Sequence, residues 1–334
     1  MLGQTVRVLS VDGGGIRGII PALILEELER KLTRRGKAPV FSRLFDLMAG
    51  TSTGGLIVLG LACPGEKAGR RVLPRYTPAD LSRFYRDRGA DIFPFRRFNA
   101  LRAMSQAFTD KYDYRGYEVL LKENFGDATL RDGLCPLLVT SYDINRGLPH
   151  FFKHRPGGRY WEDLNFRMAD AARATSAAPT FFEPAVVESL GPEVRRFYLV
   201  DGSMVANNPA LIAYSEARKL YPGALRYVII SLGTGILPRR FSYLDVRRWG
   251  YLDWVSPSKD VPLLSEYSQG QSAAVEHMLN RMPRVSFHRL NVPLHQGSDM
   301  DDARPESLDA LIRATEEYLR VSEPLVDAAV RDLW

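Results

Sequence analysis

The sequence predicts an α/β fold, a three-layer α/β/α sandwich in which a mainly parallel central sheet lies between two layers of helices. Short continuous apolar runs, typical of strands covered on both faces, recur along the chain. Helical patterns lie between these runs, and strands that alternate with helices indicate a parallel sheet. The apolar runs are residues 6–11, 137–140, 197–200 and 227–232, and the clearest helical patterns are residues 18–32, 165–176 and 209–220.

The first sixty residues contain two strand–turn–helix units. Residues 6–11 (VRVLSV) predict a strand, and from Gly18 onward the apolar residues follow helical spacing, with Pro21 suited to the first turn. The second unit is a short apolar segment that ends at Ala49, a GTSTGG turn and a helix rich in small residues. Far along the chain, residues 239–301 show weaker periodicity and several prolines. We therefore expect irregular structure there, before a final helical segment from Glu306.

Length and composition indicate one globular domain over residues 1–334. Of the 334 residues, 45% are hydrophobic, which is enough for a sizeable core, and no internal repeat or low-complexity tract is visible. The net charge of +6 fits a surface attracted to anionic lipid, and it is equally compatible with no charged partner. We expect no nucleic acid polymer as a partner, and the sequence does not define the oligomeric state.

Cysteine usage and hydropathy predict a cytoplasmic protein whose contact with membranes is peripheral. Cys63 and Cys135 lie far apart without CxxC spacing, which argues against a disulfide framework or a zinc site. The N-terminus lacks a basic leader followed by an apolar stretch, so we expect a cytoplasmic location. The longest apolar run, Leu56–Cys63, is well short of the ~20 residues that span a bilayer. Any membrane contact is therefore expected to be peripheral.

The sharpest motif is G-x-S-x-G at residues 50–54, placed after a predicted strand and before a predicted helix. A serine at such a turn projects its hydroxyl from the sheet edge, and the following helix N-terminus favours developing negative charge. Ser52 is therefore a candidate nucleophile. The competing interpretation is a Gly/Ser turn that caps a helix, since serine and threonine are common N-cap residues.

A glycine-rich loop, residues 12–18 (DGGGIRG), follows the first predicted strand and has two interpretations. It fits the G-x-G-x-x-G dinucleotide fingerprint, but the acidic residue expected about 20 positions further on is missing, because residues 32–35 are Leu-Thr-Arg-Arg. Alternatively, the amides of Gly13, Gly14 and Gly15 form a concave anion site that suits the oxyanion of an acyl-transfer intermediate. Arg17 would add positive charge there or hold the loop.

Asp201 ends the predicted strand of residues 197–200 and is followed by Gly202 and Ser203. Catalytic groups often lie at the carboxyl ends of parallel strands, which makes Asp201 a candidate general base. Taken singly, the same residues also suit an Asx-turn.

Taken together, these motifs resemble the patatin-like phospholipases. The resemblance is carried in order by DGGGIRG at 12–18, GTSTGG at 50–55, ATSAAP at 174–179, DGS at 201–203 and SLGTG at 231–235. It implies that Ser52 is the nucleophile, that Asp201 is the general base, and that Gly13, Gly14 and Gly15 with Arg17 form the oxyanion hole. One departure is visible, since Ser203 occupies a position where the family usually has glycine or alanine.

The resemblance further implies a catalytic dyad, without a histidine, that hydrolyses acyl esters of glycerolipids. Asp201 would accept the Ser52 proton directly, so its pKa should lie above the usual value of about 3.9. No metal or organic cofactor is required by this chemistry. The chain order Ser52, Asp201, His288 would match an α/β-hydrolase triad, but none of the histidines lies in a small-residue loop at a strand end; they are His150, His154, His277, His288 and His295.

Two extensions concern the membrane and regulation. Residues 91–111 combine large hydrophobes with basic residues, which suits a lid or a membrane contact, or simply a helix that covers the sheet. Certain compact bacterial members of the resembled family are anti-phage effectors that a cyclic oligonucleotide activates, and the length of this chain is compatible with that antiviral role. The alternatives from other classes are a nucleotide-binding protein and a catalytically silent interaction module.

Overall fold

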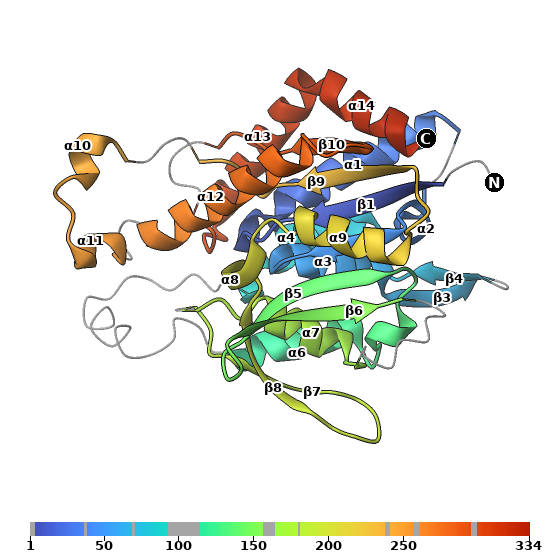
Figure 1. Ribbon diagram of the computed structural model, residues 1–334, viewed down its shortest axis with the longest axis horizontal. Helices are drawn as coiled ribbons and strands as arrows, with labels where there is room; N and C mark the ends of the chain where they lie inside the picture. The colour runs from blue at the N-terminus through green and yellow to red at the C-terminus, as the bar shows by residue number, and fades with distance from the viewer. Residues whose placement is uncertain are drawn as a thin grey trace.

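The computed structural model describes residues 4–36, 39–68, 71–92, 114–155, 164–179, 181–237, 241–256, 261–294 and 299–334. An eight-stranded sheet has the order β10-β9-β1-β2-β5-β8-β7, with β6 also paired to β5 (Figure 1). Its strands are β1 (Thr5–Val11), β2 (Leu47–Gly50), β5 (Leu137–Asp143), β6 (Leu148–His154), β7 (Ala185–Glu188), β8 (Arg196–Asp201), β9 (Arg226–Leu232) and β10 (Val285–Leu290). A separate hairpin joins β3 (Pro64–Ala68) to β4 (Arg71–Pro74).

The predicted fold class is confirmed, because the sheet is mostly parallel and lies between helices. Strands β10, β9, β1, β2 and β5 pair in parallel, whereas β6 and β8 pair antiparallel with β5 and β7 pairs antiparallel with β8. Successive side chains of a strand alternate between the two faces of a sheet. In β1, accordingly, Leu9 and Val11 enter one buried cluster, while Val6 and Val8 enter a second cluster on the opposite face.

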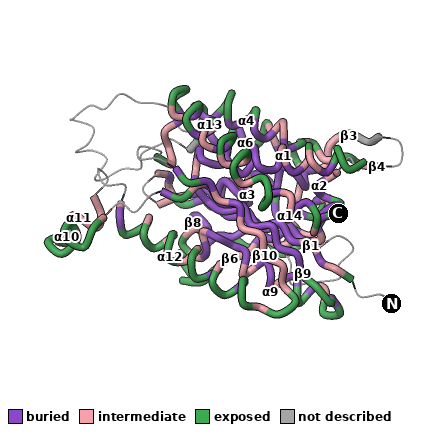
Figure 2. Tube along the Cα trace, turned by 90° about the horizontal axis from the view of Figure 1, so that it is seen from above, coloured by how far each residue is buried: buried purple, intermediate pink, exposed green. Residues whose placement is uncertain are grey.

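Helices cover both faces of the sheet. The larger cluster holds apolar residues of α1 (Ile19–Arg34), α2 (Phe41–Leu44), α3 (Thr53–Ala62), α4 (Pro78–Ile92), α6 (Tyr114–Phe125), α7 (Met168–Thr175), α13 (Pro305–Val321) and α14 (Glu323–Leu333). The smaller cluster is closed by α9 (Ala210–Leu220) and α12 (Pro262–Leu279). Figure 2 shows the strands as the buried centre between helices whose outer turns are exposed.

Short helical turns connect these elements near the strand ends. They are η1 (Gly15–Gly18), η2 (Leu130–Asp132), α8 (Ser203–Ala206), α10 (Tyr243–Val246) and α11 (Tyr251–Trp254). Within the ranges given above, no helix combines the length and the apolar character needed to cross a membrane.

The expectation of irregular structure across residues 239–301 is wrong, because α12 and β10 lie inside that range. The helical pattern of α12 is weak since only Pro262, Val275 and Leu279 are buried along its 18 residues. Several of its other inward contacts are polar, and a hydrophobic periodicity does not register them. The predicted final helical segment is confirmed as α13 and α14. Most of the lid or membrane segment predicted at residues 91–111 lies outside the described residues; residues 91 and 92 end α4.

Candidate active site

Strands β2 and β8 meet end to end along one edge of β5. The other edge of β5 is taken by β6, which pairs with it from Leu137 to Asp143. On the remaining edge, β2 pairs with the start of β5, ending with Gly50 opposite Val139, and β8 pairs with its far end, with Asp201 opposite Ser141. Because β8 is antiparallel to β5, the carboxyl ends of β2 and β8 point toward each other.

This convergence corrects one premise of the sequence analysis. Asp201 ends a strand that runs against β5, so it does not lie at the carboxyl end of a parallel strand as expected. Because β8 runs antiparallel to β5, its last residue lies next to the turn that follows β2. Positions 52 and 201, which are distant in sequence, are thereby brought together.

Ser52 lies at a tight turn between β2 and α3. Its φ of 52° is in the left-handed region, which costs a non-glycine residue about 1–3 kcal/mol and is found mainly at functional sites. The flanking glycines cannot be replaced without steric conflict. A Cβ on Gly50 would lie 2.2 Å from the Gly54 carbonyl oxygen, and a Cβ on Gly54 would lie 2.2 Å from the Val11 carbonyl oxygen. The turn therefore packs tightly between β1 and α3 and is held in its strained form.

Thr175, at the end of α7, ties the serine turn to β5 and β8. Its side-chain oxygen accepts a hydrogen bond from the Ser52 amide at 2.9 Å and donates to the Thr140 carbonyl at 2.6 Å. Its own carbonyl accepts from the Gly202 amide at 3.1 Å, next to Asp201. One fully buried threonine thus holds both halves of the candidate site at β5.

Asp201 is 1% exposed, and its buried position shapes its acid–base chemistry. Burial raises the pKa of Asp201 from 3.8 to about 6, against the lowering effect of hydrogen bonds from the Ser203 amide and from the Ser52 and Ser203 side chains. The Ser203 amide donates to Asp201 Oδ1 at 2.7 Å, so the Asx-turn interpretation also holds locally. Ser52 is thus among the residues whose side chains act on the Asp201 carboxyl, and that carboxyl can exchange a proton near neutral pH.

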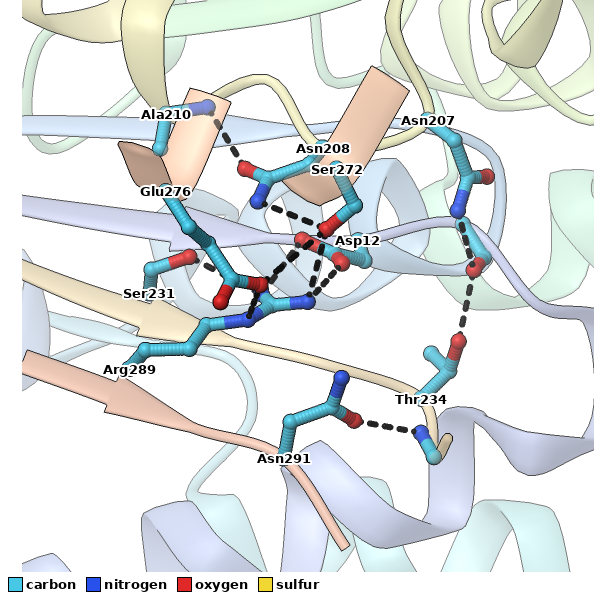
Figure 3. Close-up of polar contacts among 12 residues, drawn as sticks. Asp12, Asn207, Asn208, Ala210, Ser231, Thr234, Ser272, Glu276, Arg289 and Asn291 are labelled. Atoms are coloured by element: carbon cyan, nitrogen blue, oxygen red, sulfur yellow. Dashed lines mark hydrogen bonds and ion pairs between the residues drawn. The ribbon is translucent and has the colours of Figure 1, made fainter. Parts of the chain in front are cut away.

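The glycine-rich loop passes directly beside Ser52. A Cβ on Gly13 would lie 3.2 Å from the Ser52 Cβ, and a Cβ on Gly14 would lie 2.2 Å from Thr234 Oγ1. The Gly13 carbonyl accepts hydrogen bonds from Thr234 Oγ1 at 2.6 Å and from Asn207 Nδ2 at 3.3 Å (Figure 3). These two anchors belong to the SLGTG segment after β9 and to the turn after α8.

The loop amides differ in what they bind. The Gly13 amide donates to the Asn207 carbonyl at 3.1 Å, so it already has an acceptor, in contrast to its expected place in an oxyanion hole. Within the described ranges, the amides of Gly14 and Gly15 have no acceptor, and they are the two expected donors left for an anion. Arg17 is buried in η1, and its amide donates to the Gly14 carbonyl.

The four histidines that the structure describes are engaged elsewhere. His150 packs against Phe152, Phe166 and Phe197, and burial lowers its pKa to about 4. His288 Nε2 lies 2.8 Å from Asp332 Oδ2. His277 on α12 contacts Arg281, which follows that helix. His154 lies on β6, and His295 lies outside the described residues. The order Ser52, Asp201, His288 therefore does not become a triad.

Sequence reasoning assigned no role to Thr175, Thr234 and Asn207, although the first two lie in the ATSAAP and SLGTG motifs. The signal was present as small polar residues at the ends of helices and strands, with Thr175 ending α7, Asn207 following α8 and Thr234 following β9. Their partners in space were not visible in the sequence.

The fold and the strained strand–turn–helix serine define a class of α/β hydrolytic enzymes. Within it, the family model for "Patatin-like phospholipase" matches residues 9–214. The chain is 32% identical to "Patatin-like protein 2" of Arabidopsis thaliana, covering 95% of this chain and 84% of the relative. It is 31% identical to "Patatin-like protein 1" of Oryza sativa subsp. indica, covering 99% and 78%. The chain belongs to the patatin-like phospholipase family.

Membership in this family supports lipid acyl hydrolysis as the general activity. A further relative, 33% identical over 96% of this chain and 88% of its own length, is named "Probable inactive patatin-3-Kuras 1" from Solanum tuberosum. Membership in the family therefore does not by itself establish catalysis.

Proposed function

We propose that this protein is a serine acyl hydrolase that cleaves fatty-acyl esters of glycerophospholipids through a Ser52–Asp201 dyad. The observation that carries the proposal is the meeting of β2 and β8 on one edge of β5. This arrangement sets a strained serine against a buried carboxyl whose pKa is about 6. A base with a pKa near the working pH is suited to accept the serine proton without a histidine.

The reaction proceeds in two acyl-transfer steps. The Asp201 carboxylate accepts the hydroxyl proton as Ser52 Oγ attacks the ester carbonyl carbon. Collapse of the tetrahedral intermediate breaks the bond to the glycerol oxygen, which takes the proton from Asp201, and leaves an acyl-serine. A water then loses a proton to Asp201 and attacks the acyl carbonyl carbon. The bond to Ser52 Oγ breaks, Ser52 Oγ takes that proton from Asp201, and the fatty acid leaves.

The amides of Gly14 and Gly15 are the proposed oxyanion donors. They follow Gly13, whose Cβ position lies 3.2 Å from the Ser52 Cβ, and the described residues supply them no acceptor. Each well-placed donor contributes about 2.7–4 kcal/mol to stabilisation of such an intermediate. The N-terminus of α3 adds a favourable dipole at the same position. Arg17, buried beneath the loop, supports it in this proposal.

The test is hydrolysis of phosphatidylcholine vesicles, with free fatty acid and lysolipid measured by mass spectrometry. Wild type is expected to release both, whereas Ser52→Ala and Asp201→Asn lose at least about 10²-fold in rate. Asp127→Asn is the matched control, because that carboxylate is fully exposed. Full turnover after removal of either dyad residue would end the proposal.

Peripheral membrane contact is part of the proposal, and a second segment supports it. Residues 241–256 form an arm whose own aromatic side chains pack edge to face, with the ring centroids of Trp249 and Trp254 5.2 Å apart. Its outer residues are apolar and open, including Tyr251 at 79% and Leu252 at 78% exposure. An arm of aromatic, leucine and arginine side chains suits the interfacial zone of a bilayer. In Figure 1 this arm, α10 and α11, lies on the side of the molecule toward α8, the turn that follows Asp201.

The cyclic-oligonucleotide activator and the antiviral role stay hypotheses from the family resemblance, as does the cytoplasmic location. Vesicle hydrolysis measured with and without a panel of cyclic dinucleotides tests the activator, and identical rates across the panel would remove it. The rival nucleotide-binding function predicts thermal stabilisation by NAD or ATP without esterase activity. A silent interaction module predicts neither.

A further inference from the structure

Arg289, a buried arginine on β10, forms an ion pair with Asp12, the residue that begins the glycine-rich loop. Arg289 Nη1 donates to Asp12 Oδ1 at 3.0 Å and Nη2 donates to Asp12 Oδ2 at 2.6 Å, a two-point pairing (Figure 3). The side chains are 11% and 4% exposed, respectively. Bidentate arginine–carboxylate pairs fix geometry as well as supplying energy. The orientation of Asp12 is therefore set from a strand more than 270 positions away in the chain.

The same guanidinium is bound from two further elements. Nη1 donates to Ser231 Oγ of β9 at 2.9 Å, and Nη2 donates to Ser272 Oγ of α12 at 3.2 Å. Nε lies 2.9 Å from Glu276 Oε1, also on α12. Arg289 thus joins β1, β9 and α12 at the sheet edge where the glycine-rich loop begins.

A second branch of this network reaches the segment after Asp201. The Asn208 side chain donates from Nδ2 to Ser272 Oγ at 3.2 Å. The Asn208 backbone amide donates to Gln271 Oε1 at 3.0 Å. The neighbouring Asn207 carbonyl receives the Gly13 amide. The amide and the carbonyl of Gly13 are therefore both bonded to Asn207, whose neighbour Asn208 is bonded to α12.

We propose that Arg289 is a positioning residue for the oxyanion hole, acting by fixing Asp12 and by neutralising its negative charge. This inference rests on the proposed function, since it assigns a role relative to the Gly14 and Gly15 amides. Asp12 lies two residues before Gly14, with only Gly13 between them, so a rotation of its peptide shifts the start of the loop that carries these donors. A displacement of 1 Å at such a site can lower a rate by about 10².

Charge gives Arg289 a second effect that packing alone lacks. Asp12 and Glu276 are both acidic, and Arg289 is the cation in contact with both. Without it, Asp12 and Glu276 would face each other with no cation between them, at the start of the glycine-rich loop. Like charges in a poorly hydrated site repel strongly. The transition state then loses stabilisation although the ester still binds.

The experiment measures turnover of a soluble p-nitrophenyl ester, with active sites counted by end-point fluorophosphonate labelling. Arg289→Met is expected to lower kcat about 10²-fold and to change KM less than about threefold. Adding Asp12→Asn to Arg289→Met removes the carboxylate charge that has lost its counterion, and is expected to restore kcat at least about tenfold. Arg289→Lys keeps the charge but loses the two-point pairing, and should fall between wild type and Arg289→Met.

Arg226→Met is the matched control, because Arg226 also joins β9 and β10 by bonding Ser286 Oγ and Asp332, away from the loop. It should keep kcat per labelled site. The inference is overturned if Arg289→Met turns over at the wild-type rate per site, or if Asp12→Asn fails to restore it. Should Arg289→Met not fold, a wild-type kcat for Arg289→Lys overturns it equally. Failure of the dyad itself would be seen separately, as full activity in Ser52→Ala.

Discussion

Asp201→Asn should remove activity and at the same time stabilise the protein at high pH. Burial raises the pKa of Asp201 from 3.8 to about 6, so the folded state holds the proton more tightly than the unfolded state does. Above pH 6 the folded protein carries a buried carboxylate, and at 1.36 kcal/mol per pH unit the cost is about 3 kcal/mol. As the pH falls from 6 toward 3.8, this cost disappears. Asparagine never bears it.

The assay is urea unfolding of both proteins between pH 4 and pH 8. The free energy of unfolding of Asp201→Asn, minus that of wild type, should rise by up to about 3 kcal/mol from pH 4 to pH 8. The change with pH is the diagnostic quantity, because an amide in place of a carboxyl also adds a constant packing effect. Wild-type kcat/KM should fall as the pH drops through about 6, where the base becomes protonated. A difference that is flat with pH would refute the assigned environment of Asp201.

Three further predictions concern the turn, the loop and the arm. Thr175→Val strips two buried hydrogen bonds and should be at least about 1 kcal/mol less stable in urea than Thr175→Ser, which keeps the hydroxyl; equal stability would contradict the bridging role. Gly14→Ala places a Cβ 2.2 Å from Thr234 Oγ1 and should lose most ester turnover, while Gly270→Ala, with open space around it, should not. Replacing Tyr251 and Leu252 by serine should weaken binding to anionic vesicles about tenfold or more and leave soluble-ester turnover intact. Val119→Ser, which changes an exposed apolar residue outside the arm, is the control. If both variants bind vesicles equally well, the arm is not a membrane contact.

Local motifs allowed much of this molecule to be predicted. The strand–turn–helix units at residues 6–32 and 47–62 follow from hydrophobic patterns and glycines that act within a few positions. Three closely spaced glycines also predicted an anion site at residues 13–15, and this prediction is kept for Gly14 and Gly15 in the proposed function. The structure describes each of these units close to its expected bounds.

Features that depend on distant partners were out of reach. The antiparallel direction of β8 depends on which part of β5 was already occupied by β2, and no pattern within residues 196–201 encodes that. Helix α12 lacks a clear hydrophobic periodicity, because Ser272 and Glu276 on its inner side contact Arg289. Arg289 itself sits in an ordinary strand, and only its pairing with Asp12 distinguishes it.

The most direct measurement is to label the wild-type protein with a fluorophosphonate probe and to map the adduct by peptide mass spectrometry, comparing labelling rates with Asp201→Asn. We predict a single adduct on the peptide that contains Ser52 and a labelling rate at least about 10²-fold slower in the asparagine variant. An adduct at another residue, or equal rates in the two proteins, would contradict the pairing of nucleophile and base at the junction of β2 and β8.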